Sequence, residues 1–305
     1  MDHEMKQRIA QLCETVLFDE PLSRLTTIRV GGPAEALLYP KSVSELEEMI
    51  RFARQNKLPL FILGAGSNLL VPDVGIRGMV VHLGQGFSKI IVEDQHADEA
   101  VVYVEAGVGI PRLVDFTAEQ GLSGLEPLAG IPGNVGGSLV MNAGTPDGAT
   151  GDHIVTVTFL DKEARLQTWV REAIHFEYRK TSFPKGAVVL SARFRLRPGS
   201  MEVIKAKVKE YREKRAVSQP LNVPNLGSVF KNPPKRFAGA LIEEAGLKGV
   251  RVGKARISPK HANFIINEGG ATSRDIHVLI GLIKDKVKEK FNITLEPEVR
   301  IVGEK

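Results

Sequence analysis

The chain has 305 residues, of which 43% are hydrophobic and 25% are charged, with 41 basic residues against 36 acidic ones. These fractions are typical of a folded globular chain and exclude extended disorder, and the length predicts two or three domains. No run of about 18 uninterrupted apolar residues occurs, so no membrane-spanning helix is expected. Residues 1–14 lack the apolar centre of a secretory signal, which predicts a cytoplasmic protein.

The single cysteine, Cys13, excludes an internal disulfide and a cysteine-rich metal site. Its apolar spacing with Leu12 and Leu17 predicts a small buried side chain rather than a catalytic thiol. The net charge of +5 is scattered, and its densest part lies in a helical pattern over residues 203–215. Few aromatic residues accompany it, so we expect a solvated helix face and no nucleic-acid partner.

In the first two thirds of the chain, the sequence pattern predicts a helix that begins after the N-cap residue Ser42. Three strands, a second helix and two more strands are expected to follow it in that order. The expected ranges are 42–55 for the first helix, 58–63, 79–83 and 100–104 for strands, 111–120 for the second helix, and 154–160 and 188–196 for strands. A helix that follows a strand so early gives the chain β–α–β character, with helices covering a sheet.

After residue 198 the pattern becomes helical again. We expect helices at 201–217, at 237–245 with Phe237, Leu241 and Ala245 on one stripe, and from a capping box at Thr272 through Val287. A loop is expected at 219–235 and a closing strand at 293–302. The sequence thus predicts an α+β fold with three domains, at 1–77, 78–200 and 201–305.

Glycine is concentrated between residues 121 and 151, which hold nine glycines and only two charged side chains, Glu126 and Asp147. Four of the nine lie in Gly130–Gly137, and Gly144 follows shortly after. A segment with few side chains can bring its main-chain N–H groups close to a ligand. The pattern therefore predicts a site for a phosphate-bearing cofactor rather than a series of tight turns.

A second glycine loop, Gly64–Leu69, follows the predicted strand at 58–63. It differs from the dinucleotide loop of a Rossmann fold, because Leu69 replaces the third glycine and Pro72 interrupts the helix that should follow. The sequence also lacks a Gly-Lys-Ser/Thr loop, which excludes the common nucleotide hydrolases. We expect this loop to bind an anion, and two such loops suit an extended cofactor with a central diphosphate.

Five motifs in order along the chain resemble those of the UDP-N-acetylenolpyruvoylglucosamine reductase family. The two glycine loops look like the flavin-binding loops of a vanillyl-alcohol-oxidase-like (PCMH-type) FAD domain. The other three motifs are Tyr178–Phe183, Gly227–Pro233 and Leu295–Arg300. The match runs from about Thr26 to Gly303, and it is to the shorter branch, because no insertion occurs within 182–198. The resemblance implies that the first two domains form a PCMH-type FAD-binding unit and that the third is an α+β substrate domain.

The same resemblance implies an activity and a set of binding residues. The family reduces the enolpyruvyl ether of a UDP sugar to the lactyl ether of UDP-N-acetylmuramate, with noncovalent FAD and with NADPH as the hydride donor. The implied FAD-binding residues are Gly64, Ala65, Gly66, Ser67, Asn68, Leu69, Gly130, Ile131, Pro132, Gly133, Gly136, Gly137, Asn142 and Gly144. The implied substrate-binding residues are Tyr178, Arg215, Lys231 and Asn232. A monomer that binds no metal, nucleic acid or membrane is expected.

Hydride addition to the vinyl carbon C3 leaves negative charge at C2, so the reaction needs electrophilic groups on the adjacent carboxylate and a proton donor at C2. Arg179 matches the first need, because a guanidinium binds a carboxylate through two parallel hydrogen bonds. Glu298 matches the family's second electrophilic position, where it would be protonated or act through water, with Glu296 as its rival on the same strand face. Ser228 matches the proton donor.

Some alternatives stay open at this point. His261 and Arg300 could contact a ligand, although a loop histidine with satisfied hydrogen bonds is the simpler interpretation of His261. The chain could also be an FAD oxidase or dehydrogenase with another substrate, or a protein that binds a sugar nucleotide without redox chemistry. Ser228 and Glu298 favour the reductase, because neither has an evident role in plain alcohol oxidation. A flavin absorption band would exclude the non-redox alternative.

Overall fold

The computed structural model describes residues 1–303. The chain forms two compact units, each built from three separate stretches. Unit 1 consists of Met1–Phe18, Ala36–Ala65 and Gly78–Lys214, and unit 2 consists of Asp19–Glu35, Gly66–Arg77 and the chain from Arg215 onward. The division into domains 1–77, 78–200 and 201–305 stays a prediction.

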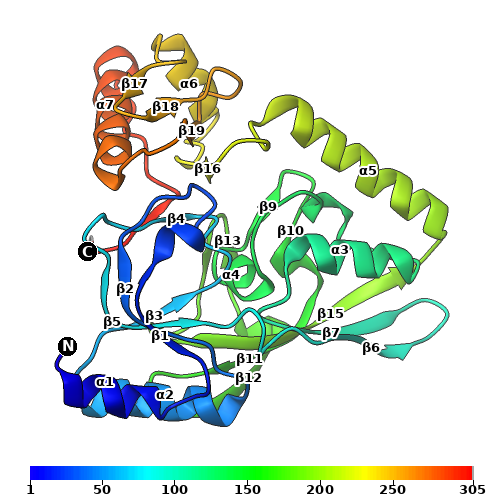
Figure 1. The fold of residues 1–305 in the computed structure, drawn as a ribbon. Coiled ribbons are helices and arrows are strands. Elements are labelled where there is room, and N and C mark those ends of the chain that lie inside the picture. Colours follow the sequence, from blue (N-terminus) through cyan, green and yellow to red (C-terminus); the bar gives the residue numbers. More distant parts are fainter. Residues whose placement is uncertain (304–305) are drawn as a thin grey trace. The chain divides into compact units, whose positions relative to one another are not determined.

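Unit 1 contains most of the helices and two large sheets (Figure 1). Its helices are α1 (His3–Ala10), α2 (Val43–Gln55), α3 (Ile110–Glu119), α4 (Val135–Val140) and most of α5 (Met201–Ser218). The first sheet has the order β1-β2-β5-β3, formed by β1 (Val16–Pro21), β2 (Pro33–Leu38), β5 (Ile76–His82) and β3 (Leu60–Leu63). Residues 19–21 of β1, 33–35 of β2 and 76–77 of β5 are assigned to unit 2. Strands β3 and β5 are parallel.

The second sheet of unit 1 has the order β12-β11-β15-β7-β6, and β8 pairs with the end of β15. These strands are antiparallel and comprise β6 (Ile90–Gln95), β7 (Ala100–Glu105), β8 (Leu122–Ser123), β11 (Ile154–Leu160), β12 (Leu166–Val170) and β15 (Val188–Pro198). Two short hairpins complete the unit, β9–β10 (Gly144–Thr145 and Gly148–Ala149) and β13–β14 (Phe176–Glu177 and Lys180–Thr181).

The predicted elements of unit 1 form for the reasons that their patterns indicate. Helix α2 begins where the Ser42 hydroxyl accepts a hydrogen bond from Glu45 N, and it buries Leu46, Met49, Ile50 and Ala53. Helix α3 has its proline in the first turn, where no N–H is needed. The apolar faces of both helices and of both sheets meet in one core. Cys13 is half-buried against this core, and burial raises the pKa of its thiol.

Unit 2 combines a small antiparallel sheet of order β16-β19-β18-β17 with two helices (Figure 1). Its elements are β4 (Leu69–Leu70), β16 (Asn225–Ser228), α6 (Ala238–Glu244), β17 (Arg251–Val252), β18 (Ala255–Ile257), β19 (Phe264–Asn267), α7 (Ser273–Phe291) and β20 (Arg300–Ile301). Strands β4 and β20 pair in parallel. Helix α7 packs against β17 and β18.

Helix α7 shows why unit 2 is stable. The predicted capping box is present, with Thr272 Oγ1 accepting from Asp275 N and the Asp275 carboxylate accepting from Thr272 N, both at 3.0 Å. The Asp73 carboxylate accepts from the next two amides of the first turn, which satisfies further N–H groups and complements the helix dipole. The core face is apolar and comprises Ile276, Leu279, Ile280, Ile283 and Val287. Each buried aliphatic side chain contributes about 1.5–3 kcal/mol.

Four of the stated expectations differ from the structure, and several short elements, among them α1 and β17–β19, were not predicted. The expected loop at 219–235 contains strand β16, and the glycine-rich segment contains helix α4. The expected strand at 293–302 is reduced to β20, because Pro297 cannot donate to a ladder and makes only an isolated bridge with Phe230. Phe237 was placed on the buried stripe of α6 but is 69% exposed, since it precedes the first helical residue and has extended backbone.

Among residues 1–303, the structure contains no helix with the length and apolar character needed to cross a bilayer.

Candidate active site

The first glycine loop begins at the carboxyl ends of two parallel strands in unit 1. Leu63, the last residue of β3, lies opposite His82, the last residue of β5, and Gly64 follows directly. The His82 ring hydrogen-bonds to the Gly64 main chain, its Nδ1 accepts from Gly84 N at 3.3 Å, and the ring packs on Tyr39 with centroids 5.3 Å apart. Burial lowers the pKa of His82, so the ring is neutral at pH 7.

Sequence reasoning did not identify His82. The usable signal was its position at the end of a predicted strand, because polar residues at the carboxyl ends of neighbouring parallel strands meet at one edge of the sheet.

The second glycine loop lies beside the first within unit 1. A Cβ built on Gly64 would be 3.8 Å from Asn134 Cβ. The loop is held by the segment that follows β7, because Ile110 N donates to Gly133 O at 2.8 Å, Val135 N to Val108 O and Gly136 N to Ala106 O, both at 2.9 Å. Helix α4 begins at Val135, with Asn134 as its N-cap residue. The structure thus brings two loops together that are about 70 residues apart in sequence.

The glycines of the two loops differ in what the fold requires of them. Gly66, in unit 2, has φ +61°, and a Cβ on it would lie 2.1 Å from the Leu25 carbonyl oxygen. A Cβ on Gly136 would lie 3.0 Å from Ala106 Cβ. By contrast, Gly64 and Gly137 have room for a side chain and no positive φ, and nothing lies within 4 Å of a Cβ on Gly137. The fold therefore demands glycine at 66 and 136 and leaves it unexplained at 64 and 137.

Residues 130–133 form the first half of the second loop, before helix α4. Gly130 and Gly133 have positive φ angles of 76° and 142°, which side chains rarely adopt. Ile131 is half-buried and its N–H donates to Leu128 O, whereas Pro132 is exposed.

Asn142 connects the second loop to the hairpin β13–β14. Its Nδ2 donates to Glu177 O and its Oδ1 accepts from Gly151 N, both at 3.0 Å, and the residue is buried with φ +41°. The two-residue turn of this hairpin is Tyr178-Arg179. Arg179 Nη2 donates to Gly144 O at 3.2 Å, and its guanidinium lies 5.0 Å from the centre of the Tyr178 ring. Asn142 thus positions the hairpin that carries Arg179.

In unit 2, the second half of the first loop meets the C-terminal segment. Asn68 Nδ2 donates to Glu298 O at 3.0 Å, and Arg300 N donates to Asn68 O at 3.1 Å. Leu69 is buried and pairs with Arg300 in the parallel β4–β20 ladder. Ser67 lies next to the turn before Ser228, since a Cβ on Gly227 would be 3.6 Å from the Ser67 carbonyl oxygen.

Ser228 and Glu298 are joined through a single residue, Val229. Ser228 ends β16, directly after Gly227, whose φ of +71° creates the bulge in this strand. The Val229 carbonyl oxygen accepts from Glu298 N at 2.8 Å. Ser67, Asn68, Ser228 and Glu298, from three distant parts of the sequence, therefore form one cluster in unit 2.

Three of the implied substrate-binding residues, Lys231, Asn232 and Arg215, lie in unit 2, and two of them have described protein partners. Lys231 forms an ion pair with Glu296, the rival of Glu298, and Glu296 is 70% exposed. Asn232 Oδ1 accepts from Ala238 N at 3.0 Å and so holds the start of α6. Arg215 is half-buried in the last turn of α5.

The contacts of His261 agree with the interpretation as a loop histidine, and its contact with a ligand stays untested. Its Nδ1 accepts from Asn263 N at 3.2 Å and its ring packs edge-on against Phe264 at 4.9 Å. Burial and then the charge of Lys248 lower its pKa.

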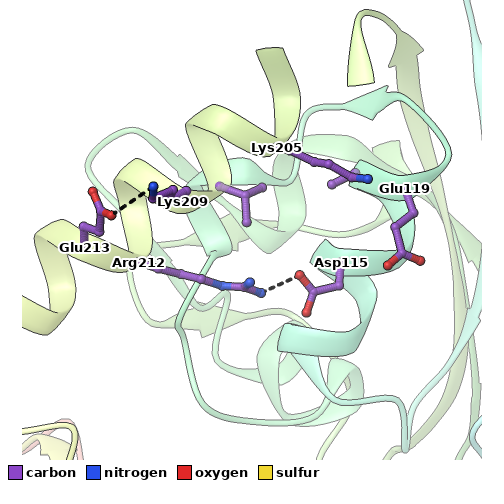
Figure 2. A pocket seen from close by; sticks show the side chains of 8 residues that line it. Asp115, Glu119, Lys205, Lys209, Arg212 and Glu213 are labelled. Atoms are coloured by element: carbon purple, nitrogen blue, oxygen red, sulfur yellow. Dashed lines mark hydrogen bonds and ion pairs between the residues drawn. The ribbon is translucent and has the colours of Figure 1, made fainter. Parts of the chain in front are cut away.

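A cavity of about 290 Å³ lies between α3 and α5 in unit 1 and contains none of the predicted site residues (Figure 2). Charged side chains of both signs line it, and Arg212 pairs with Asp115 across it at 2.7 Å. The neutralised pairs give it no preference for a phosphate, and we do not assign the reaction to it.

Gly64 and Gly137, which the fold leaves unexplained, suit an α+β protein of the FAD-binding class. Residues 34–169 match the family model described as "FAD binding domain". Residues 219–302 match the model described as "UDP-N-acetylenolpyruvoylglucosamine reductase, C-terminal domain".

Relatives named UDP-N-acetylenolpyruvoylglucosamine reductase match almost the whole chain. The protein from Moorella thermoacetica is 45% identical over 95% of this chain and 94% of its own, and that from Syntrophus aciditrophicus is 45% identical over 95% and 92%. The crystal structure of the reductase from Thermus caldophilus superposes with a TM-score of 0.81 at 36% identity, over 94% of this chain and 98% of that one. The chain belongs to the UDP-N-acetylenolpyruvoylglucosamine reductase family, and the predicted fold class and FAD cofactor are confirmed.

Proposed function

We propose that this chain is an NADPH-dependent flavoprotein reductase that converts UDP-N-acetylglucosamine enolpyruvate to UDP-N-acetylmuramate for peptidoglycan synthesis. Family membership over nearly the full length supports the reaction, and the match of residues 219–302 favours it over an oxidase that shares only the flavin fold. The observation that carries the proposal is the cluster in unit 2, because the main-chain bond between Glu298 N and Val229 O brings the segments that carry Ser228 and Glu298 together.

The two loops fit a cofactor with a central diphosphate. The amides of Ile131, Val135 and Gly136 donate to protein carbonyls, so we assign the diphosphate to other main-chain N–H groups of the two loops. Gly64 and Gly137 leave room where a side chain would stand, which suits close approach of the cofactor. FAD, when bound, supplies the hydride that it receives from NADPH.

Arg179 binds the substrate carboxylate in this proposal. Its guanidinium offers a planar fork of donors, and the left-handed turn at φ +58° and the bond to Gly144 O fix its position. A guanidinium held in place stabilises the charge that spreads into the carboxylate as C2 becomes negative. Tyr178, 54% exposed beside Arg179, is assigned to the same substrate.

Ser228 gives its proton to C2, and Glu298 assists as a protonated group or through a water molecule. A serine hydroxyl is a weak acid, but the enolate that it protonates is a strong base, so direct transfer is feasible. Lys231, Asn232 and Arg215 are assigned to the UDP diphosphate, which Lys231 reaches by exchanging its ion pair with Glu296.

Half-reaction kinetics test this proposal. Substrate should rapidly reoxidise the reduced wild-type flavoprotein, and in deuterated solvent the product should carry deuterium at C2. Ser228→Ala should slow reoxidation by about 10² or more, the usual effect of a lost general acid, without slowing flavin reduction by NADPH. Arg179→Lys should slow the same half-reaction. Reduced protein that the substrate does not reoxidise would refute the proposed function.

The proposal includes a monomer that works in the cytoplasm. Sedimentation of the purified holoenzyme tests the first expectation, and cell fractionation tests the second.

A further inference from the structure

Asn263 makes an unusual double contact with the chain that follows Ser228. Its Oδ1 accepts from Phe230 N at 3.0 Å, and its Nδ2 donates to Phe230 O at 2.8 Å. Its own carbonyl oxygen accepts from Val229 N at 2.9 Å. Three hydrogen bonds from one residue, 4% exposed, therefore hold Val229 and Phe230.

The Asn263 side chain continues the hydrogen bonding of the β16–β19 pair beyond the last paired residue of β16. The β16–β19 pairing finishes with Ser228 opposite Phe264, and the amide of Asn263 then offers a donor and an acceptor as a peptide group would. An apolar side chain there would leave two polar main-chain groups of buried Phe230 without partners. Asn263 is itself fixed, because its N–H donates to His261 Nδ1.

We propose that Asn263 is a positioning residue that sets the place of the Ser228 hydroxyl by holding the main chain of Val229 and Phe230. The effect reaches Glu298 as well, because Val229 O accepts from Glu298 N. The proposal rests on the proposed function of Ser228 as the proton donor. A displacement of about 1 Å at a reacting group can slow a reaction by about 10²-fold, so small movements of this segment matter.

Asn263→Asp gives a readout that a merely structural role would not produce. As a carboxylate, the new side chain cannot donate to Phe230 O and repels it. As a neutral acid, it donates to Phe230 O and accepts from Phe230 N, which restores both bonds. Reoxidation of the reduced variant by UDP-N-acetylglucosamine enolpyruvate should therefore be at least about tenfold slower than wild type at high pH and should recover as the pH falls. Flavin reduction by NADPH should stay unchanged.

Asn267→Asp is the matched control. Asn267 ends strand β19, which begins directly after Asn263. It is 7% exposed, and its amide also bridges main-chain groups, donating to Ile28 O and accepting from Gly269 N and Ala271 N. It has no hydrogen bond to Val229 or Phe230 among those described for residues 1–303. Asn267→Asp therefore measures how much a buried carboxyl group in β19 slows reoxidation when it does not contact Val229 or Phe230.

The outcomes separate the two proposals. If wild type is reoxidised and Asn263→Asp follows the pH profile of Asn267→Asp, the positioning role is wrong and the reductase assignment stands. If substrate does not reoxidise wild type, both fail together. Should Asn263→Asp not fold, Asn263→Gln keeps both amide groups one methylene further out, and reoxidation at the wild-type rate in that variant would overturn the positioning role.

Discussion

Gly137 is a glycine that no described contact within the fold requires. It lies in the first turn of α4, is exposed, and has no atom within 4 Å of a Cβ built on it. Glycine in a helix is less stable than alanine by about 1 kcal/mol. No contact described in unit 1 requires glycine at this position, and under the proposed function we attribute it to close approach of the cofactor.

Gly137→Ala should therefore raise stability while weakening flavin binding. We expect a higher urea midpoint, by up to about 1 kcal/mol in the free energy of unfolding, and an FAD affinity at least about tenfold lower. Gly281→Ala in α7, another open helical position, should stabilise equally and leave FAD affinity unchanged. Unchanged flavin titration of Gly137→Ala would remove α4 from the cofactor site.

The buried histidines His82 and His261 should make the free energy of unfolding depend on pH. Burial lowers the pKa of both below the value of about 6.5 in the unfolded chain. Below pH 6.5 the unfolded chain therefore binds more protons than the folded one, and acidification costs stability, by at most about 1.4 kcal/mol per pH unit for each histidine. Above pH 6.5 this contribution is fully present. Urea unfolding at pH 7.5 and 5.5 should show a smaller acid loss for His82→Gln than for wild type, and equal losses would contradict this account.

At the scale of elements, the hairpin β13–β14 depends on its neighbours rather than on its own two short strands. Thr181 Oγ1 donates to Val140 O at 2.8 Å, and Asn142 and Arg179 add the two bonds described above. A two-residue ladder alone is marginal in water. Asn142, predicted to bind FAD, uses both polar groups of its side chain on protein partners.

Asn142→Asp tests which role holds. The variant keeps the acceptor for Gly151 N but loses the donor to Glu177 O, so the turn that carries Arg179 should move. We expect a higher KM for the UDP-sugar substrate, by about tenfold, with FAD content unchanged. Thr181→Val, which loosens the same hairpin from its other strand, should shift KM in the same direction. Loss of flavin from Asn142→Asp would instead support direct cofactor binding.

The elements that could be predicted are those with long periodic patterns. Helices α2, α3 and α7 and strands β7, β11 and β15 follow their predicted ranges closely, since spacing and caps act locally. Strand β16 was missed because Asn225-Leu226-Gly227-Ser228 does not alternate and is held by pairing with β19, which is distant in sequence. Helix α4 was missed because two glycines in six residues argue against a helix, which here rests on bonds to the segment after β7.

The candidate site also combines residues that local motifs identify with residues whose partners are distant in sequence. Motifs identified Ser228, Glu298 and Arg179 as candidates. Asn263 bonds to the main chain of Phe230, a partner distant in sequence that no local pattern indicates. For His82 the sequence offered only its place at the end of a predicted strand, and its bond to the Gly64 main chain appears once β3 and β5 are paired.

For the whole molecule, the main feature is that neither unit is continuous in sequence. Unit 2 uses Gly66–Arg77, and β4 within that stretch pairs with β20 near the C-terminus. A chain that ends after Glu298 would lack both β20 and buried Val299. We expect the free energy of unfolding to fall by more than about 2 kcal/mol, measured by urea titration of the truncated and full chains. An unchanged midpoint would show that this pairing is dispensable.

The same pairing sets a condition on synthesis. Leu69 and Leu70 leave the ribosome roughly 230 residues before Arg300 and Ile301. At about 5–20 residues per second, the early strand waits on the order of 10–50 s for its partner. During that time Leu69, Leu70 and Val71, all buried in the finished protein, have no complete core to enter. The nascent chain therefore exposes an aggregation-prone apolar segment. We expect the yield of folded protein in a cell to depend on how well chaperones shield that segment until translation ends.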